Sequence, residues 1–130
     1  MKRLLIDTNV YAAFMMKRPD VVETLIGAEQ ILICPTVAGE LLAGFKSGNR
    51  ERSNRQIWEK FLDNPATKEV GIDTETAEFY AEIFRNLRGN GTPIPTNDMW
   101  IAACAFQQGV PVYTLDAHFR QIDGLLLVPV

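Results

Sequence analysis

Short, wholly apolar runs alternate along the chain with longer segments in which apolar residues recur every three or four positions. The apolar runs indicate buried strands, and we expect strands at residues 3–6, 31–34, 69–72, 112–114 and 125–128. The longer segments have the spacing of amphipathic helices, which we expect at residues 10–16, 21–26, 36–47, 51–62, 74–87 and 96–109, with a short helical turn at 117–122. This alternation predicts the α/β fold class: a single three-layer α/β/α domain, residues 1–130, whose central and mainly parallel sheet has about five strands.

Length and composition agree with one folded domain and exclude several classes of protein. The chain has 130 residues, of which 47% are hydrophobic and 22% charged, so disorder and fibrous repeats are excluded. No apolar run approaches the ~18 residues of a membrane-spanning helix, and the run before Asp7 is too short for a signal peptide. We therefore expect a cytoplasmic protein without membrane contact, in which Cys34 and Cys104 are buried, reduced thiols.

Charged side chains are unevenly distributed, although the formal net charge is only −3. Residues 46–60 contain five basic side chains against two acidic ones, whereas residues 61–82 contain six acidic side chains and one lysine. A basic segment beside an acidic one permits a polyanionic partner, but two solvated helix faces also explain the pattern.

Four acidic residues lie where a parallel sheet gathers functional groups, at and beyond the carboxyl ends of its strands. They are Asp7, Glu40, Asp98 and Asp116, and all four have apolar neighbours. Asp7 and Asp116 also suit helix caps, and Asp98 suits the positive end of its helix dipole, so each of these has a purely structural explanation. Glu40 is harder to explain in this way, because it lies one residue beyond the capping-box position of a helix that begins at Thr36.

Carboxylates that converge raise one another's pKa unless a cation lies between them. Their oxygen atoms suit Mg²⁺ or Mn²⁺, which bind phosphate oxygens readily, so the sequence predicts an acidic divalent-metal site suited to phosphoryl chemistry. The polar turn and cap residues that could support such a site are Thr8, Asn9, Asn97 and Thr114. His118 either contacts a phosphate or orients Asp116, or it is a surface histidine. As it is the only histidine and the cysteines are not paired, a nitrogen- and sulfur-ligated metal site is not expected.

Four segments that contain these acids resemble the motifs of the PIN-domain family and, within it, of the VapC-type toxins of toxin–antitoxin pairs. The segments are Leu5–Asn9, Pro35–Leu41, Asn97–Ala103 and Thr114–Phe119, and they follow the family's order along the whole chain. The resemblance implies a Mg²⁺- or Mn²⁺-dependent endoribonuclease toxin that hydrolyses phosphodiester bonds of single-stranded or structured RNA. It also implies a homodimer, silenced by a VapB-type antitoxin whose C-terminal segment occupies the active-site groove.

By the same resemblance, the family's acidic set corresponds to Asp7, Glu40, Asp98 and Asp116, all of them catalytic. The first three would be the principal metal ligands, and Asp116 would bind a second metal or the water shell. The basic segment then becomes a candidate RNA-binding surface, because phosphate contacts need Lys or Arg even on an acidic protein. The residues of this surface are Arg50, Arg52 and Arg55.

Three other classes of protein fit part of the pattern. A phosphoacceptor receiver domain would use Asp7 and Asp73, but it needs a lysine late in the chain, and the last lysine is Lys68. A haloacid-dehalogenase-like phosphatase needs an aspartate where Asn9 stands. A catalytically silent PIN domain that binds RNA or a protein stays open as the alternative, and metal-dependent cleavage that is lost on substitution of one acid distinguishes a nuclease from it.

Overall fold

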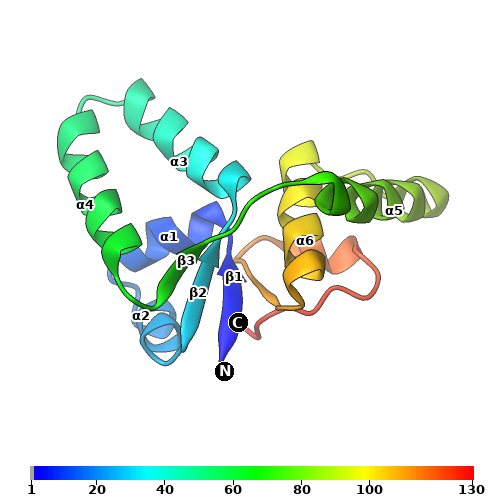
Figure 1. Cartoon of the computed structure of the whole chain (residues 1–130), viewed down its shortest axis with the longest axis horizontal. Helices are drawn as coiled ribbons and strands as arrows, with labels where there is room; N and C mark the ends of the chain where they lie inside the picture. Colours follow the sequence, from blue (N-terminus) through cyan, green and yellow to red (C-terminus); the bar gives the residue numbers. More distant parts are fainter. Residues whose placement is uncertain (1) are drawn as a thin grey trace.

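A four-stranded parallel sheet forms the centre of the computed structural model, which describes residues 2–130 (Figure 1). The strands are β1 (Arg3–Ile6), β2 (Gln30–Ile33), β3 (Thr67–Glu69) and β4 (Val112–Tyr113), in the order β3-β2-β1-β4. Leu4 pairs with Ile31 across β1 and β2, and Leu5 pairs with Val112 across β1 and β4. The predicted α/β class with a parallel sheet is confirmed. Because all strands run in the same direction, their carboxyl ends meet at one edge.

Two of the predicted strands differ from the structure. The third strand ends at Glu69 and not at residue 72. It is an outermost strand of the sheet, and its exposed Lys68 and Glu69 gave little hydrophobic signal. The fifth predicted strand, residues 125–128, is only an isolated parallel bridge between Val112 and Leu127. Two backbone hydrogen bonds hold this segment beside Val112, but a proline follows at position 129 and offers no N–H to extend the ladder.

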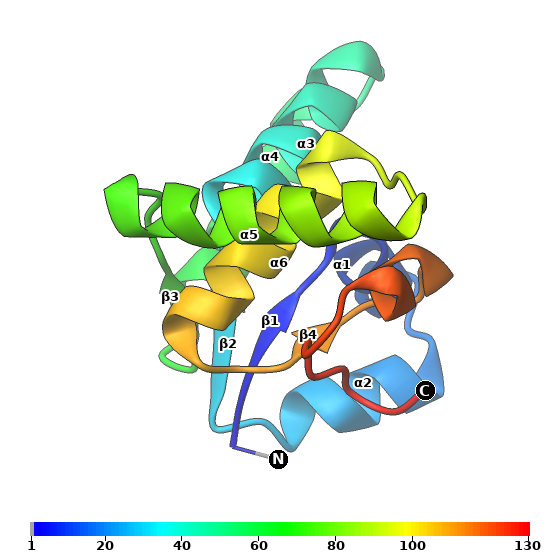
Figure 2. The same cartoon turned by 90° about the vertical axis from the view of Figure 1, so that its right-hand side faces the viewer.

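Helices cover both faces of the sheet, as Figures 1 and 2 show. The helices are α1 (Thr8–Met15), α2 (Pro19–Ile26), α3 (Pro35–Ser47), α4 (Glu51–Asp63), α5 (Thr74–Asn90), α6 (Thr96–Gln108) and the short 3₁₀ helix η1 (Ala117–Gln121). The α1, α2 and α4 helices lie on one face, whereas α6 lies on the other with α5 packed along it. The three-layer prediction is therefore confirmed, and α1, α3 and α6 begin near the carboxyl edge of the sheet.

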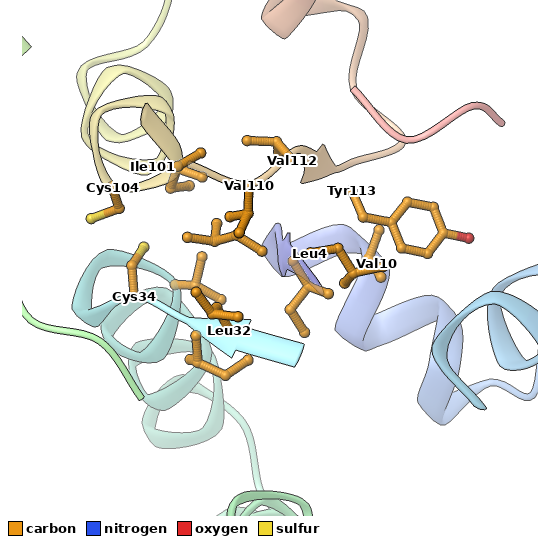
Figure 3. Packing of buried hydrophobic residues seen from close by; sticks show 14 of the residues in the cluster. Leu4, Val10, Leu32, Cys34, Ile101, Cys104, Val110, Val112 and Tyr113 are labelled. Atoms are coloured by element: carbon orange, nitrogen blue, oxygen red, sulfur yellow. The ribbon is translucent and has the colours of Figure 1, made fainter. Parts of the chain in front are cut away.

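The hydrophobic core lies on both faces of the sheet, and Figure 3 shows Ile101 and Cys104 of α6 together with Val10 of α1 around residues of the strands. Leu4, Leu5 and Ile6 of β1 are fully buried, as expected for a central strand covered on both faces. Cys34 and Cys104 are free and buried, as predicted, and the hydrogen bond between them together with burial raises the pKa of Cys104. Within residues 2–130, none of the helices combines the length and apolar character needed to cross a membrane.

Candidate active site

The structure brings Asp7 and Asp116 to the same edge of the sheet. Asp7 directly follows β1 and caps α1, and Asp116 follows β4 and caps η1. The two strands are parallel neighbours, and the backbone N–H of Asp7 donates to the carbonyl of Tyr113 at 2.9 Å. Both acids thus act as the helix caps that the sequence allowed, and capping accounts for only one oxygen of each carboxylate.

Asp7 is a buried carboxylate, with 6% of its surface exposed. Its Oδ1 accepts a 2.7 Å hydrogen bond from the backbone N–H of Thr8, and its Oδ2 accepts one of 2.7 Å from the hydroxyl of Thr114. Burial raises the pKa of Asp7 above its ordinary value; the hydrogen bonds from Thr114 and Thr8 oppose this, and the charges of Asp98 and Glu40 add to it. The buried carboxyl group therefore lies within the electrostatic field of two other acids.

Glu40 connects three helices at the site. It lies in the second turn of α3, where its Oε1 accepts a 2.8 Å hydrogen bond from the hydroxyl of Thr8 in α1. Its Oε2 accepts a 3.3 Å hydrogen bond from the side-chain amide of Asn97 in α6. These contacts link residues 32 and 57 positions apart, and neither of them is a helix-capping contact.

Asp98 and Asp116 face each other across the imidazole of His118. The Nδ1 atom of His118 is 3.2 Å from Oδ2 of Asp98 and 3.2 Å from Oδ2 of Asp116. Burial raises the pKa of Asp98; the hydrogen bond and the charge of His118 lower it, whereas the charges of Asp116 and Glu40 raise it. The charge of Asp98 in turn raises the pKa of Asp7, so Asp98 interacts with all three other acids.

The four polar residues predicted to support the site all lie around it. Thr8 and Asn97 fix Glu40, as described above. Thr114 donates to Asp7 and accepts a 3.0 Å hydrogen bond from the backbone N–H of Asp116. Asn9 binds no carboxylate directly; its Oδ1 accepts the backbone N–H of Leu115 at 3.1 Å, which holds the loop after β4 against the start of α1.

The arginines of the candidate RNA-binding surface lie elsewhere. Arg50 precedes α4, and Arg52 and Arg55 lie on it, over the opposite face of the sheet from α6 (Figure 1). Arg55 and Lys46 both pair with Glu51, at 3.7 Å and 3.3 Å. These two ion pairs are exposed, and such pairs contribute little to stability.

The sequence alone did not decide whether His118 belongs to the site or is a surface histidine. In this Asp-x-His spacing Asp116 is the N-cap of η1 and His118 is the second residue of the turn, so the backbone N–H of His118 donates to Asp116 Oδ1 at 2.9 Å. That spacing was the available signal. The contact with Asp98, 20 positions earlier in the sequence, requires the folded chain.

The carboxylate oxygens of the four acids suit a divalent cation. In the described part of the chain, residues 2–130, no lysine or arginine forms an ion pair with any of the four acids. Mutual repulsion of uncompensated carboxylates favours a cation between them, and carboxylate oxygens are ligands of Mg²⁺ and Mn²⁺. One atom each from Asp98, Asp116 and His118 lies within 4.8 Å of the others, as in a metal-binding cluster.

Known proteins resemble this chain in sequence and in fold. The family model described as PIN domain matches residues 4–125. Ribonuclease VapC4 of Mycobacterium tuberculosis is 27% identical over an alignment that covers 99% of this chain and 98% of that protein. The solved VapBC2 structure from Rickettsia felis, bound to a DNA fragment from its promoter, has a TM-score of 0.86 at 23% identity and covers 97% of both chains. VapBC-5 from M. tuberculosis, of the VapBC family of toxin–antitoxin systems, has a TM-score of 0.76 at 21% identity over 98% of both chains.

The chain belongs to the PIN-domain family. Within that family it is similar to VapC-type ribonucleases along its whole length, and its fold is shared with solved VapBC structures.

Proposed function

We propose that this chain is a metal-dependent endoribonuclease and the toxin of a type II toxin–antitoxin system. The observation that carries the proposal is the convergence of Asp7, Glu40, Asp98 and Asp116 at one edge of the sheet, where burial and, to a smaller extent, the charges of neighbouring acids raise the pKa of Asp7 and Asp98. The similarity to ribonuclease VapC4 supports the reaction type.

In this mechanism the four carboxylates would hold Mg²⁺ or Mn²⁺ at the end of the sheet. The bound cation would supply an activated water and charge stabilisation at the scissile phosphodiester. Thr114 and Thr8 hold the Asp7 carboxylate by one hydrogen bond to each oxygen. Thr8 and Asn97 hold Glu40 in the same way, so its carboxylate is oriented before any ligand arrives.

RNA binding requires basic side chains outside the acidic site. We assign this role to Arg50, Arg52 and Arg55, which lie on or beside α4 and are available to phosphate groups. Arg55 and Lys46 share the single carboxylate of Glu51, so the segment keeps an excess of positive charge. RNA that contacts these residues would extend from the carboxyl edge of the sheet over α3 and α4.

An apolar groove offers a surface for the antitoxin. The groove lies between α1, α2 and α4 and is lined by Phe14, Met15, Leu25, Ile26, Ile57 and Phe61. Ile26 is 75% exposed and Ile57 46% exposed, and exposed apolar clusters of this kind mark protein-binding sites. We propose that an apolar segment of a VapB-type antitoxin covers this groove while its C-terminal segment reaches the acidic site. We also propose a homodimer, which light scattering of the purified chain would detect as twice the monomer mass.

Cleavage of a mixed RNA preparation tests the proposed activity. The purified chain, free of antitoxin, is incubated with Mn²⁺, with Mn²⁺ and excess chelator, and as the Asp98→Asn variant. We expect cleavage with Mn²⁺ alone, and its loss in both other samples. Asp63→Asn is the matched control, because it makes the same chemical change at an exposed acid on α4, and it should cleave as the parent chain does.

Folded protein that cuts no RNA under any of these conditions would contradict the enzyme proposal. Retained RNA or antitoxin binding by such a protein would then favour the catalytically silent PIN domain.

A further inference from the structure

The imidazole of His118 lies between two of the proposed metal ligands. Its Nδ1 is 3.2 Å from one oxygen of Asp98 and 3.2 Å from one oxygen of Asp116. A ring nitrogen carries at most one proton, so it can make one good hydrogen bond, whereas two carboxylate oxygens face it here. A shared cation would bind all three atoms without this conflict.

Both distances from the Nδ1 atom fit such a cation. A six-coordinate ion with bonds of about 2.1 Å separates adjacent ligand atoms by about 3 Å, close to both 3.2 Å distances. The turn also prepares the arrangement, because Oδ1 of Asp116 accepts the backbone N–H of His118 at 2.9 Å. Because capping uses Oδ1, the other oxygen of Asp116, Oδ2, can bind the cation.

We propose that His118 binds the cation directly through Nδ1, together with Asp98 and Asp116, and that the site therefore favours Mn²⁺ over Mg²⁺. Oxygen ligands suit both ions, whereas imidazole suits first-row transition metals far better than Mg²⁺. This inference rests on the metal site of the proposed function. It revises the sequence-based expectation that nitrogen takes no part in metal binding, which treated His118 in isolation from Asp98.

Pulsed electron paramagnetic resonance of bound Mn²⁺ tests the ligation. The chain has a single histidine, so in untagged protein a coupling from directly bonded imidazole ¹⁴N reports on His118 alone. We expect this coupling in the parent chain and its loss in His118→Ala. In calorimetric titrations the same variant should lose roughly tenfold or more in Mn²⁺ affinity and less than about threefold in Mg²⁺ affinity. Arg120→Ala, an exposed change in the same turn, should alter neither, and circular dichroism checks that both variants fold.

The outcomes separate this inference from the proposed function. Mn²⁺ that binds in an Asp98-dependent manner, but without a directly bonded nitrogen, would overturn the role of His118 and leave the metal site standing. Equal losses of Mn²⁺ and Mg²⁺ affinity in His118→Ala would overturn the selectivity. A parent chain that binds no Mn²⁺ and cuts no RNA would overturn the proposed function itself.

Discussion

The hydroxyl of Thr114 donates a 2.7 Å hydrogen bond to Oδ2 of Asp7, joining residues 107 positions apart. The same hydroxyl oxygen accepts the backbone N–H of Asp116 at 3.0 Å. One threonine thus orients the buried carboxylate after β1 and fixes the loop that presents a second carboxylate after β4. This side chain therefore connects two acids from opposite ends of the chain.

Replacement of Thr114 by valine keeps the shape of the side chain and removes both hydrogen bonds. Because Asp7 is buried, we expect the free energy of unfolding to fall by about 1–3 kcal/mol, measured by urea denaturation at pH 7 without metal. Thr114→Ser keeps the hydroxyl and should retain most of that stability. The same unfolding free energy for the valine variant and the parent chain would show that the hydrogen bond contributes nothing.

Metal-free protein should be destabilised at neutral pH by the buried carboxylate of Asp7. Burial and the charges of Asp98 and Glu40 raise the pKa of Asp7 despite its two hydrogen bonds. As the pH rises above 3.8, the ordinary value, the unfolded chain ionises first and gains stability relative to the folded chain. The loss is complete once the pH exceeds the raised pKa of the folded state. The folded protein recovers this stability either when acid protonates Asp7 or when a cation binds.

Asp7→Asn should therefore be more stable than the parent chain at pH 7 in the presence of chelator. The difference between the two should shrink as the pH falls toward 3.8, and saturating Mn²⁺ should stabilise the parent chain but not the variant. Urea denaturation of both proteins at several pH values, with and without Mn²⁺, measures this. Asp20→Asn is a useful contrast, because a hydrogen bond from Arg18 lowers the pKa of Asp20. A parent chain that is more stable than Asp7→Asn in chelator at pH 7 would contradict the argument.

The fold class and the four acids were accessible to sequence analysis for a physical reason. Central strands such as β1 are buried on both faces, so they appear as apolar runs, and a polar residue such as Asp7 that follows a run lies at the carboxyl end of the sheet. The edge strand β3 was misplaced because its residues are partly exposed and carry no such signal. The bridge at Leu127 was predicted as a strand because apolar composition alone cannot show where the hydrogen-bond ladder stops.

Contacts between distant segments were beyond the reach of sequence patterns. Thr8 and Asn97 were predicted as supporting residues because of their place in turns, but their shared partner, Glu40, is apparent only once α1, α3 and α6 are packed together. The position of His118 depends in the same way on Asp98, which comes from another element. The pKa changes of Asp7 and Asp98 also arise from burial and from neighbouring charges that are remote in sequence.

Reversal of charge at Arg50, Arg52 and Arg55 tests the RNA-binding surface. Glutamate at all three positions should weaken binding of single-stranded RNA and reduce the slope of log affinity against log salt by about 2, if each arginine contacts one phosphate. Filter binding to the Asp98→Asn variant, which should not cut the RNA, measures both quantities. The same reversal at Arg3, Arg85 and Arg88, which lie on β1 and α5 rather than on α4, is the control. Unchanged affinity and slope in the α4 variant would remove these arginines from the proposed interface.

If the proposed antitoxin covers the apolar groove, a charged side chain there should prevent inhibition. Ile26 lies at the end of α2 with 75% of its surface exposed, so arginine is tolerated there in the free chain, but it would place an unpaired charge in a covered groove. Ile26→Arg should therefore cleave RNA at the parent rate and lose at least tenfold in antitoxin affinity, as measured by calorimetry. Leu126→Arg introduces the same charge at another exposed apolar position, 66% exposed and outside the groove, and should still be inhibited. Full inhibition of Ile26→Arg by the antitoxin would place the main contact elsewhere.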